Sequence, residues 1–271
     1  MDELARYNKE RWEDLARADI AFSRPALDLD AASARLMLDP RGLLGGVEGK
    51  SVLCLASGGG QQSAAFGILG ADVTVLDLSE TQLERDREAA AHYGLTVSTV
   101  QGDMRDLSRF DAGAFDVVWH AHSITFIPDV RAVFGEVARV LRPGGLYQVD
   151  CPNPFVAGVD ERDWNGEAYP LKLPYVDGAE VVCADNRWEV RDREGNRRMV
   201  EGPKEFRHAL STLVNGLAGS GFVILGLWED LGVDADAAPG TWEHFKRIAP
   251  PGFSLWAAYR PDVLQRLKPA E

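Results

Sequence analysis

The sequence predicts a doubly wound α/β fold, in which helices cover both faces of a mostly parallel sheet. Apolar runs without alternation, such as residues 52–55 and 73–76, are typical of strands that are buried on both faces. Segments of helical character separate these runs, as parallel strands with right-handed crossovers require. The first run leads into three consecutive glycines, Gly58–Gly60, and the second ends in Asp77. Because ligands bind at the carboxyl ends of such strands, both features predict a binding site at that edge of the sheet.

Before the sheet, residues 1–40 are charged and amphipathic and are predicted to form helices. This stretch is unlike a secretory signal, and no run in the sequence approaches the roughly 20 apolar residues that span a membrane. We therefore expect a cytoplasmic protein without membrane attachment. The three cysteines, Cys54, Cys151 and Cys183, are far apart and odd in number. They are expected to be free thiols, with neither a disulfide nor a metal site.

The glycine turn lies between the strand at 52–55 and a helix predicted at 64–69. Glycines allow a tight turn and a close approach of the backbone to a ligand. With Asp77 placed to bind ribose hydroxyls, the pattern predicts a cofactor that contains a nucleoside. The third glycine of the dinucleotide fingerprint is replaced by Ser63, so the pattern does not establish phosphate binding.

Further strands and helices alternate up to residue 150. The strand predicted at 97–100 is followed by Asp103 and Met104, and the strand within 115–123 ends in polar residues. A helix over about 130–141, a turn at 143–145 and a strand at 146–149 complete this part.

The composition changes after residue 151, where prolines and aromatic residues accumulate. A strand over 181–190 is expected to turn at Gly195–Asn196 and to pair with 199–200 as a hairpin. A helix over 203–218 and a closing strand over 222–229 follow. The predicted organisation is thus an N-terminal helical cap (1–40), a cofactor-binding core (41–150), and a substrate-binding insertion with the completion of the sheet (151–271).

Several of these motifs together resemble class I S-adenosylmethionine-dependent methyltransferases, in particular the group that acts on small molecules. The resemblance covers residues 45–150 well and the tail from about 204 more loosely. It rests on VLCLASGGG, VTVLDLS with Asp77, the pair Asp103–Met104, FDVVWHAHSITFIPD and LRPGG. It implies a Rossmann-like, seven-stranded, mostly parallel sheet and S-adenosyl-L-methionine as the cofactor. Cys54 and Ala56 depart from the family pattern, which has an acid and a glycine at these positions.

The resemblance also implies which residues hold the cofactor. Asp77 and Gln82 would bind the ribose, Asp103 and Met104 would contact the adenine, and the hydroxyl of Tyr7 would reach the methionine carboxylate. The full predicted set is Ala56, Ser57, Gly58, Gly60, Gln61, Asp77, Leu78, Gln82, Asp103, Met104, His120 and Tyr7.

Methyl transfer mainly requires that the reactants be positioned and desolvated, with a base where the acceptor is a hydroxyl or an ammonium. His122 and His120 are the candidates for that base, because they are two residues apart at the end of a strand and would point to one face. Packing or hydrogen bonding to the backbone is the alternative for either ring. Near the acceptor we expect Trp12, whose indole could cover the sulfonium, together with His208 and Tyr175.

The net charge of −13 argues against a nucleic-acid partner and suits a neutral or cationic small molecule. The predicted function is transfer of a methyl group to such an acceptor by a monomer or homodimer. An NAD(P)-dependent oxidoreductase shares the glycine turn and Asp77, and a non-enzymatic methyltransferase-like binding protein would keep the same fold. These two functions are the alternatives.

Overall fold

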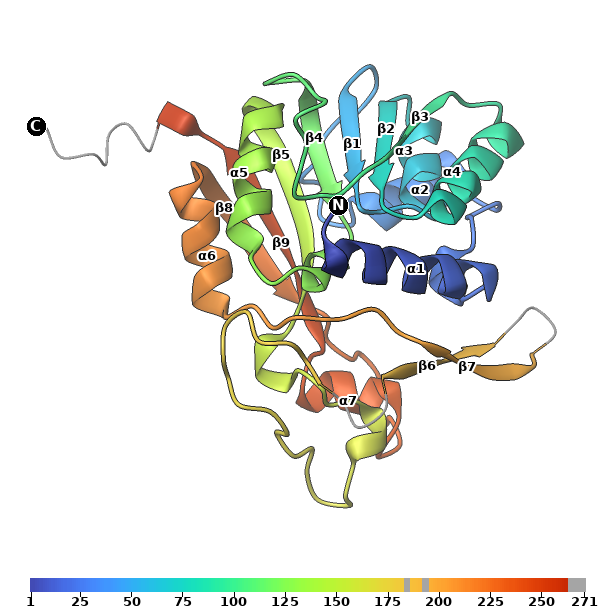
Figure 1. Ribbon diagram of the computed structural model, residues 1–271, viewed down its shortest axis with the longest axis vertical. Helices are drawn as coiled ribbons and strands as arrows, with labels where there is room; N and C mark the ends of the chain where they lie inside the picture. Colours follow the sequence, from blue (N-terminus) through green and yellow to red (C-terminus); the bar gives the residue numbers. More distant parts are fainter. Residues whose placement is uncertain (183–185, 192–194, 263–271) are drawn as a thin grey trace, which may run out of the picture.

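A seven-stranded sheet forms the centre of the molecule (Figure 1). The computed structural model describes residues 1–182, 186–191 and 195–262. The strand order is β3-β2-β1-β4-β5-β9-β8, with β1–β5 parallel where they pair and β9 antiparallel to both β5 and β8. The strands are β1 (Ser51–Leu55), β2 (Asp72–Asp77), β3 (Val97–Gln101), β4 (Phe115–His120), β5 (Leu141–Pro152), β8 (Phe222–Glu229) and β9 (Gly252–Tyr259). The predicted fold class is confirmed.

Alternate residues of the central strands belong to two separate cores. Leu53 and Leu55 pack in the core with α5 (Val130–Val140) and α6 (Leu210–Gly219). Val52 and Cys54 pack in the opposite core, with α2 (Ala31–Leu38), α3 (Gln62–Ile68) and α4 (Glu80–Tyr93). Because both faces of the sheet are buried, the strands read as unbroken apolar runs.

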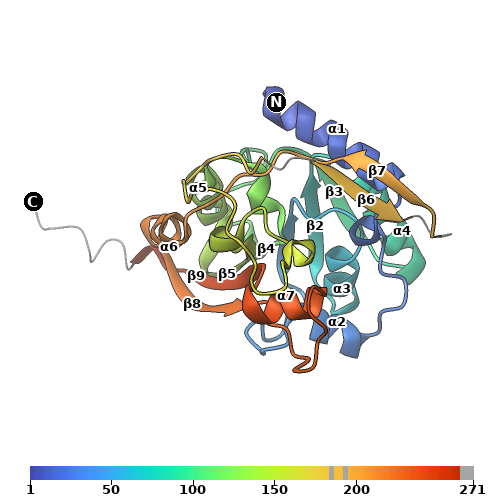
Figure 2. The same ribbon diagram turned by 90° about the horizontal axis from the view of Figure 1, so that it is seen from below.

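The carboxyl edge of the sheet is covered by elements from both ends of the chain (Figures 1 and 2). Helix α1 (Glu3–Arg17) lies across this edge, beside the antiparallel hairpin of β6 (Arg187–Arg191) and β7 (Arg197–Glu201). The remaining short elements are η1 (Ala21–Ser23), η2 (Ser123–Phe126), η3 (Pro154–Val156), η4 (Glu161–Asp163) and α7 (Trp242–Ile248). Within the described ranges, no helix has the length and apolar character needed to cross a membrane.

Three local expectations are corrected by the structure. Helix α6 begins at Leu210, because Pro203–Ala209 is not helical and His208 therefore precedes the helix. The turn expected at 143–145 is an irregularity within β5, where the register against β4 shifts between Phe115 and Val117. The hairpin is present, but β6 begins only at Arg187 and part of the predicted strand, 183–185, lies outside the described residues, as does Cys183. β9 was not anticipated from the sequence.

Candidate functional site: a cavity at the carboxyl edge

The glycine turn after β1 is held by two carboxylates. The backbone N–H of Gly58 donates to Oδ2 of Asp77 at 2.9 Å. The N–H groups of Gly59 and Gly60 donate to Oδ2 and Oδ1 of Asp86, each at 3.1 Å. All three glycine amides therefore have carboxylate acceptors within the protein, and none of these N–H groups needs a bound anion as its acceptor.

Glycine is required at two positions of this turn. A Cβ on Gly58 would lie 2.7 Å from Cβ of Gln82 and 3.0 Å from Oδ2 of Asp77. Gly60 has a φ of +79°, and a Cβ there would lie 2.5 Å from the carbonyl oxygen of Arg85. The turn thus packs directly against the end of β2 and against α4, which brings the backbone close to Asp77 and Gln82.

Burial changes the charge state of both carboxyls. Desolvation raises the pKa of Asp77 to about 6, although the N–H groups of Ser79 and Gly58 oppose this. Desolvation likewise raises the pKa of Asp86 to about 7, against hydrogen bonds from Ser63 and the glycine amides. The negative charge of Asp77 also raises the pKa of Asp86, and that of Glu13 raises the pKa of Asp77.

A cavity of about 400 Å³ opens beside this turn. It is lined by Asp77 and Leu78 from the end of β2, Gln82 from α4 and Met104 after β3. Oε1 of Gln82 is buried and has no hydrogen-bond partner in the described structure. The other residues that line the cavity are Asn8, Trp12, Phe22, Ala56, Ser57, Gly58, Gln61, Gln62, Ala121, His122, Ser123, Phe126 and Trp188.

Four aromatic residues form a roof over this cavity, which we define as Trp12, Phe22, Phe126 and Trp188. The Trp12 ring lies edge-on to the rings of Phe126, Trp188 and Phe22, at centroid distances of 5.3, 5.8 and 6.2 Å. The rings come from α1, η1, η2 and β6, so four segments that are distant in sequence enclose one space.

Asn8 fixes helix α1 over the site. Its side chain is buried, and its Nδ2 donates to the carbonyls of Phe126 and Lys204 at 3.1 and 3.3 Å. Its Oδ1 accepts the N–H of Lys204 at 2.8 Å. Asn8 was not predicted from the sequence to lie at the site, although its position four residues before Trp12, on the same helical face, was a signal for that placement.

The two histidines do not share a face. His120 is fully buried, and its Nδ1 lies 2.9 Å from the hydroxyl of Tyr147 in the core. His122 lines the cavity and has a left-handed backbone, with φ of +47°. That conformation ends the extended strand, so the alternation that the prediction assumed is lost after β4. The expectation that His120 faces the ligand is therefore corrected.

Three further residues expected at the cofactor, Gly60, Asp103 and Tyr7, do not line the cavity. The carboxylate of Asp103 accepts from Nη2 and Nε of Arg105, at 2.6 and 3.0 Å, and Arg105 also pairs with Asp2. The hydroxyl of Tyr7 donates to Glu201 on β7 at 2.7 Å. Both side chains are engaged elsewhere because a charged partner lies within reach.

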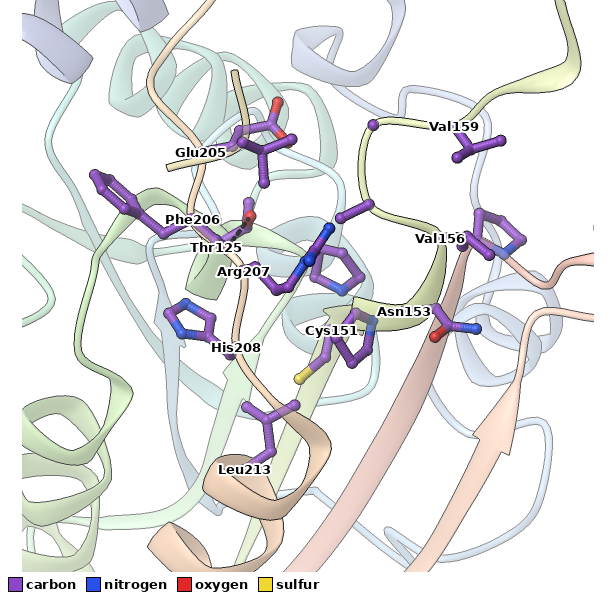
Figure 3. Close-up of a pocket in the computed structure, with 16 residues that line it drawn as sticks. Thr125, Cys151, Asn153, Val156, Val159, Glu205, Phe206, Arg207, His208 and Leu213 are labelled. Atoms are coloured by element: carbon purple, nitrogen blue, oxygen red, sulfur yellow. Dashed lines mark hydrogen bonds between the residues drawn. The ribbon is translucent and has the colours of Figure 1, made fainter. Parts of the chain in front are cut away.

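Two more cavities flank the end of β5. One, of about 420 Å³, is lined by Arg41, Asp150, Ser254 and others, and it shares His122 with the first cavity. The other, of about 170 Å³, lies on the α6 side and is lined by Thr125, Cys151, Glu205, Arg207 and His208 among others (Figure 3). Tyr175 is half-exposed beside this small cavity, with its ring 5.8 Å from the Arg207 guanidinium. Trp12 is thus separated from His208 and Tyr175, which do not line the 400 Å³ cavity.

Comparison with known proteins identifies the family. An uncharacterized methyltransferase of Bacillus subtilis, YbaJ, is 38% identical over 188 residues, which cover 69% of this chain and 71% of that protein. The chain belongs to the class I S-adenosylmethionine-dependent methyltransferases. The model of the methyltransferase domain family matches residues 53–149 of this methyltransferase.

Other relatives agree with this assignment. A ubiquinone biosynthesis O-methyltransferase of Cronobacter sakazakii is 36% identical over 180 residues, covering 64% of this methyltransferase and 69% of the relative. The crystal structure of an S-adenosylmethionine-dependent methyltransferase from Mesorhizobium loti superimposes with a TM-score of 0.56 at 22% identity, covering 86% of this chain and all of that one. At that identity the likeness concerns the fold. The predicted family, fold and enzyme class are confirmed.

Proposed function

We propose that this methyltransferase binds S-adenosyl-L-methionine in the 400 Å³ cavity and methylates a small-molecule acceptor. The observation that carries the proposal is the pairing of the glycine amides with Asp77 and Asp86. A pyrophosphate at this turn would meet two carboxyl groups instead of free N–H donors. An adenosyl ligand without phosphate suits the same turn, and this argues against the nicotinamide-dependent alternative.

The polar groups of the cavity fit the parts of this cofactor. Asp77 and the unpartnered Oε1 of Gln82 would accept hydrogen bonds from the ribose hydroxyls. Met104 and Leu78 would contact the adenine, and Gly58 leaves room for the ribose beside Asp77. Gln62 and Asn8 would lie toward the methionine end, under the aromatic roof.

When bound, S-adenosylmethionine supplies a methyl group on a sulfonium, which is already a good leaving group. The contribution of the protein is therefore enclosure and orientation. The four roof rings would cover the bound cofactor, and a ring whose face meets the sulfonium would attract it. His122 lies in the wall between the cofactor cavity and the 420 Å³ cavity, where it would take a proton from an acceptor hydroxyl or ammonium.

The acidic chain, at a net charge of −13, disfavours a nucleic acid as the acceptor. Location in the cytoplasm, and a monomer or homodimer as the working unit, stay predictions. So does a metal-free reaction. In the described part of the chain, no group of three or more His, Cys, Asp or Glu side chains is placed to hold a metal ion.

Calorimetric titration with S-adenosylmethionine, S-adenosylhomocysteine and NADH tests the cofactor. Binding of the two adenosyl-sulfur ligands alone is expected, and binding of NADH alone would overturn the proposal. Asp77→Ala should weaken the binding of S-adenosylhomocysteine by roughly 10- to 100-fold, because hydrogen bonds to a charged group are lost. The exposed Asp111→Ala is the control and should bind as the wild type does. Equal affinity of Asp77→Ala and the control would contradict the ribose assignment.

A further inference from the structure

The 170 Å³ cavity contains a buried arginine without a counter-anion. Arg207 is only 5% exposed, and no carboxylate lies within ion-pair distance of it in the ranges that the structure describes. Nη1 donates to the carbonyls of Leu173 and Pro174, and the guanidinium lies 5.8 Å from the Tyr175 ring. Nε is buried and makes no hydrogen bond. A buried charge that lacks an opposite charge is costly, so the site is built to receive an anion.

A second unpaired ionisable group lines the same cavity. The carboxyl of Glu205 makes no hydrogen bond or ion pair within the described residues, while its backbone carbonyl accepts the N–H of Val181 at 2.8 Å. Desolvation alone raises the pKa of Glu205 to about 7. No ion pair joins Glu205 to Arg207 in the described ranges, so neither side chain neutralises the other.

The close-up shows how these two groups are arranged (Figure 3). Arg207 extends from its segment toward the middle of the cavity, while Glu205 lies toward one end and Leu213 of α6 toward the other. The pair therefore suits a ligand with an acidic group at one point and a hydrogen-bond donor at another. An engineered cavity of about 150 Å³ holds benzene, so this one would accept about six to eight non-hydrogen atoms.

The small cavity adjoins the cofactor cavity through a single turn. Thr125 of η2 lines the small cavity, whereas Ser123 and Phe126 of the same turn line the larger one. The Thr125 carbonyl accepts the N–H of Phe206 at 2.7 Å, which joins this turn to the segment that carries Glu205 and Arg207.

We propose that the small cavity recognises the carboxylate of the methyl acceptor through Arg207 and a hydrogen-bond donor of the acceptor through Glu205, while the amine or hydroxyl that is methylated lies in the cofactor cavity beside His122. This proposal rests on the proposed function, because it takes the ligand to be the acceptor. It narrows the acceptor from any small molecule to a carboxylic acid with an amine or hydroxyl.

The test measures binding to protein saturated with S-adenosylhomocysteine. The probes are glycine, L-serine, L-lactate and glycolate, compared by titration calorimetry with L-serinamide and L-lactamide, which lack the carboxylate. At least one acid is expected to bind about tenfold or more tightly than its amide. Binding of S-adenosylhomocysteine itself is recorded first. Its failure would overturn the proposed function, whereas normal cofactor binding without any acid binding would overturn the acceptor proposal alone.

Variants locate the interaction. Arg207→Gln should weaken acid binding by about tenfold or more, and Arg207→Lys by less, because a charge is kept. Glu205→Gln should weaken the binding of L-serine more than that of L-lactate. Arg198→Gln, at an exposed position on β7, is the matched control and should change the binding of neither acid. If Arg207→Gln does not fold, the comparison of acids with amides on the wild type still decides the proposal.

A final assay asks whether the bound acid is the acceptor. Protein with methyl-labelled S-adenosylmethionine should transfer label to the acids that bind, and Arg207→Lys should raise their KM more than it lowers kcat. Acids that bind equally well to Arg207→Gln, or that bind without receiving label, would overturn the proposal.

Discussion

Asp77 and Asp86 divide the three glycine amides between them, and only one of these acids could be predicted. Asp77 follows a recognisable strand, so its position was set by the order of elements along the chain. Asp86 acts from the second turn of α4, and its role depends on how that helix is rotated toward the glycine turn. Gln82 and Asp86 are both buried in the structure. They are four residues apart and therefore lie on one face of α4, and this spacing was a signal in the sequence for the role of Asp86.

The histidine pair shows a second limit at the scale of residues. Strand alternation predicted one face for His120 and His122, but a left-handed residue after a strand leaves no mark in a single sequence. Asp103 and Tyr7, which were expected to contact the cofactor, do not line the cavity for a related reason. Their partners, Arg105 and Glu201, become close only through local turns or long-range packing.

His122→Ala should lower kcat by about 100-fold for a hydroxyl or ammonium acceptor, since a positioned base contributes about that much or more. Affinity for S-adenosylhomocysteine should change less than about threefold, because no hydrogen bond of His122 to the cofactor is required. Steady-state kinetics and calorimetry on the same samples check this. His92→Ala, on the exposed side of α4, is the control. A loss of cofactor affinity as large as the loss of kcat would contradict the role as a base.

At the scale of elements, the core strands were predictable and the covering elements were less so. Strands β1, β2 and β4 are mostly apolar because both faces of the sheet are buried, and this pattern needs no tertiary information. Helix α6 starts late because residues 203–209 run extended beside η2, joined to it by hydrogen bonds with Thr125 and Ile124. Those contacts link positions about eighty residues apart, and no local pattern encodes them.

The buried amide of Asn8 joins helix α1 to two other segments of the chain. Asn8→Ala should lower the free energy of unfolding by about 1–3 kcal/mol, because the Phe126 carbonyl and both backbone groups of Lys204 lose their partner. The aromatic roof should loosen as well, so affinity for S-adenosylhomocysteine should fall.

Urea denaturation and calorimetry measure these two effects of Asn8→Ala. The exposed Arg6→Ala on the same helix is the control and should stay within about 0.5 kcal/mol of the wild type. Wild-type stability and affinity in Asn8→Ala would show that α1 is held by its apolar contacts alone.

The whole molecule responds to pH through its buried acids. The pKa of Asp86 is about 7 in the folded protein, against 3.8 as the ordinary value. The folded chain therefore keeps a proton that the unfolded chain has released, and the resulting stabilisation is lost as the pH rises through 7. Asp77 and Glu205 have pKa values raised in the same direction.

Asp86→Asn isolates one of these groups. The variant is destabilised at every pH, but its deficit relative to the wild type should shrink by about 2 kcal/mol between pH 5 and pH 8, since only the wild type loses the contribution of Asp86 there. Urea denaturation at the two pH values measures the difference. For the exposed Asp111→Asn, the difference from the wild type in the free energy of unfolding should be the same at both pH values. A deficit of Asp86→Asn that grows with pH would mean that the carboxylate is stabilised by the turn.

The contact between Trp12 and Trp188 also bears on the order of events during folding. These rings meet at 5.8 Å although they are far apart in the sequence, so the enclosure closes only after α1 and the hairpin have both docked. Excess S-adenosylhomocysteine should leave the refolding rate constant unchanged within about twofold and slow unfolding, as expected for a ligand that recognises only the finished structure. Faster refolding with ligand, measured by stopped flow, would contradict this. On the ribosome, the parallel strands would be complete while Trp188 was still unsynthesised, which makes cofactor capture one of the last steps in the maturation of the enzyme.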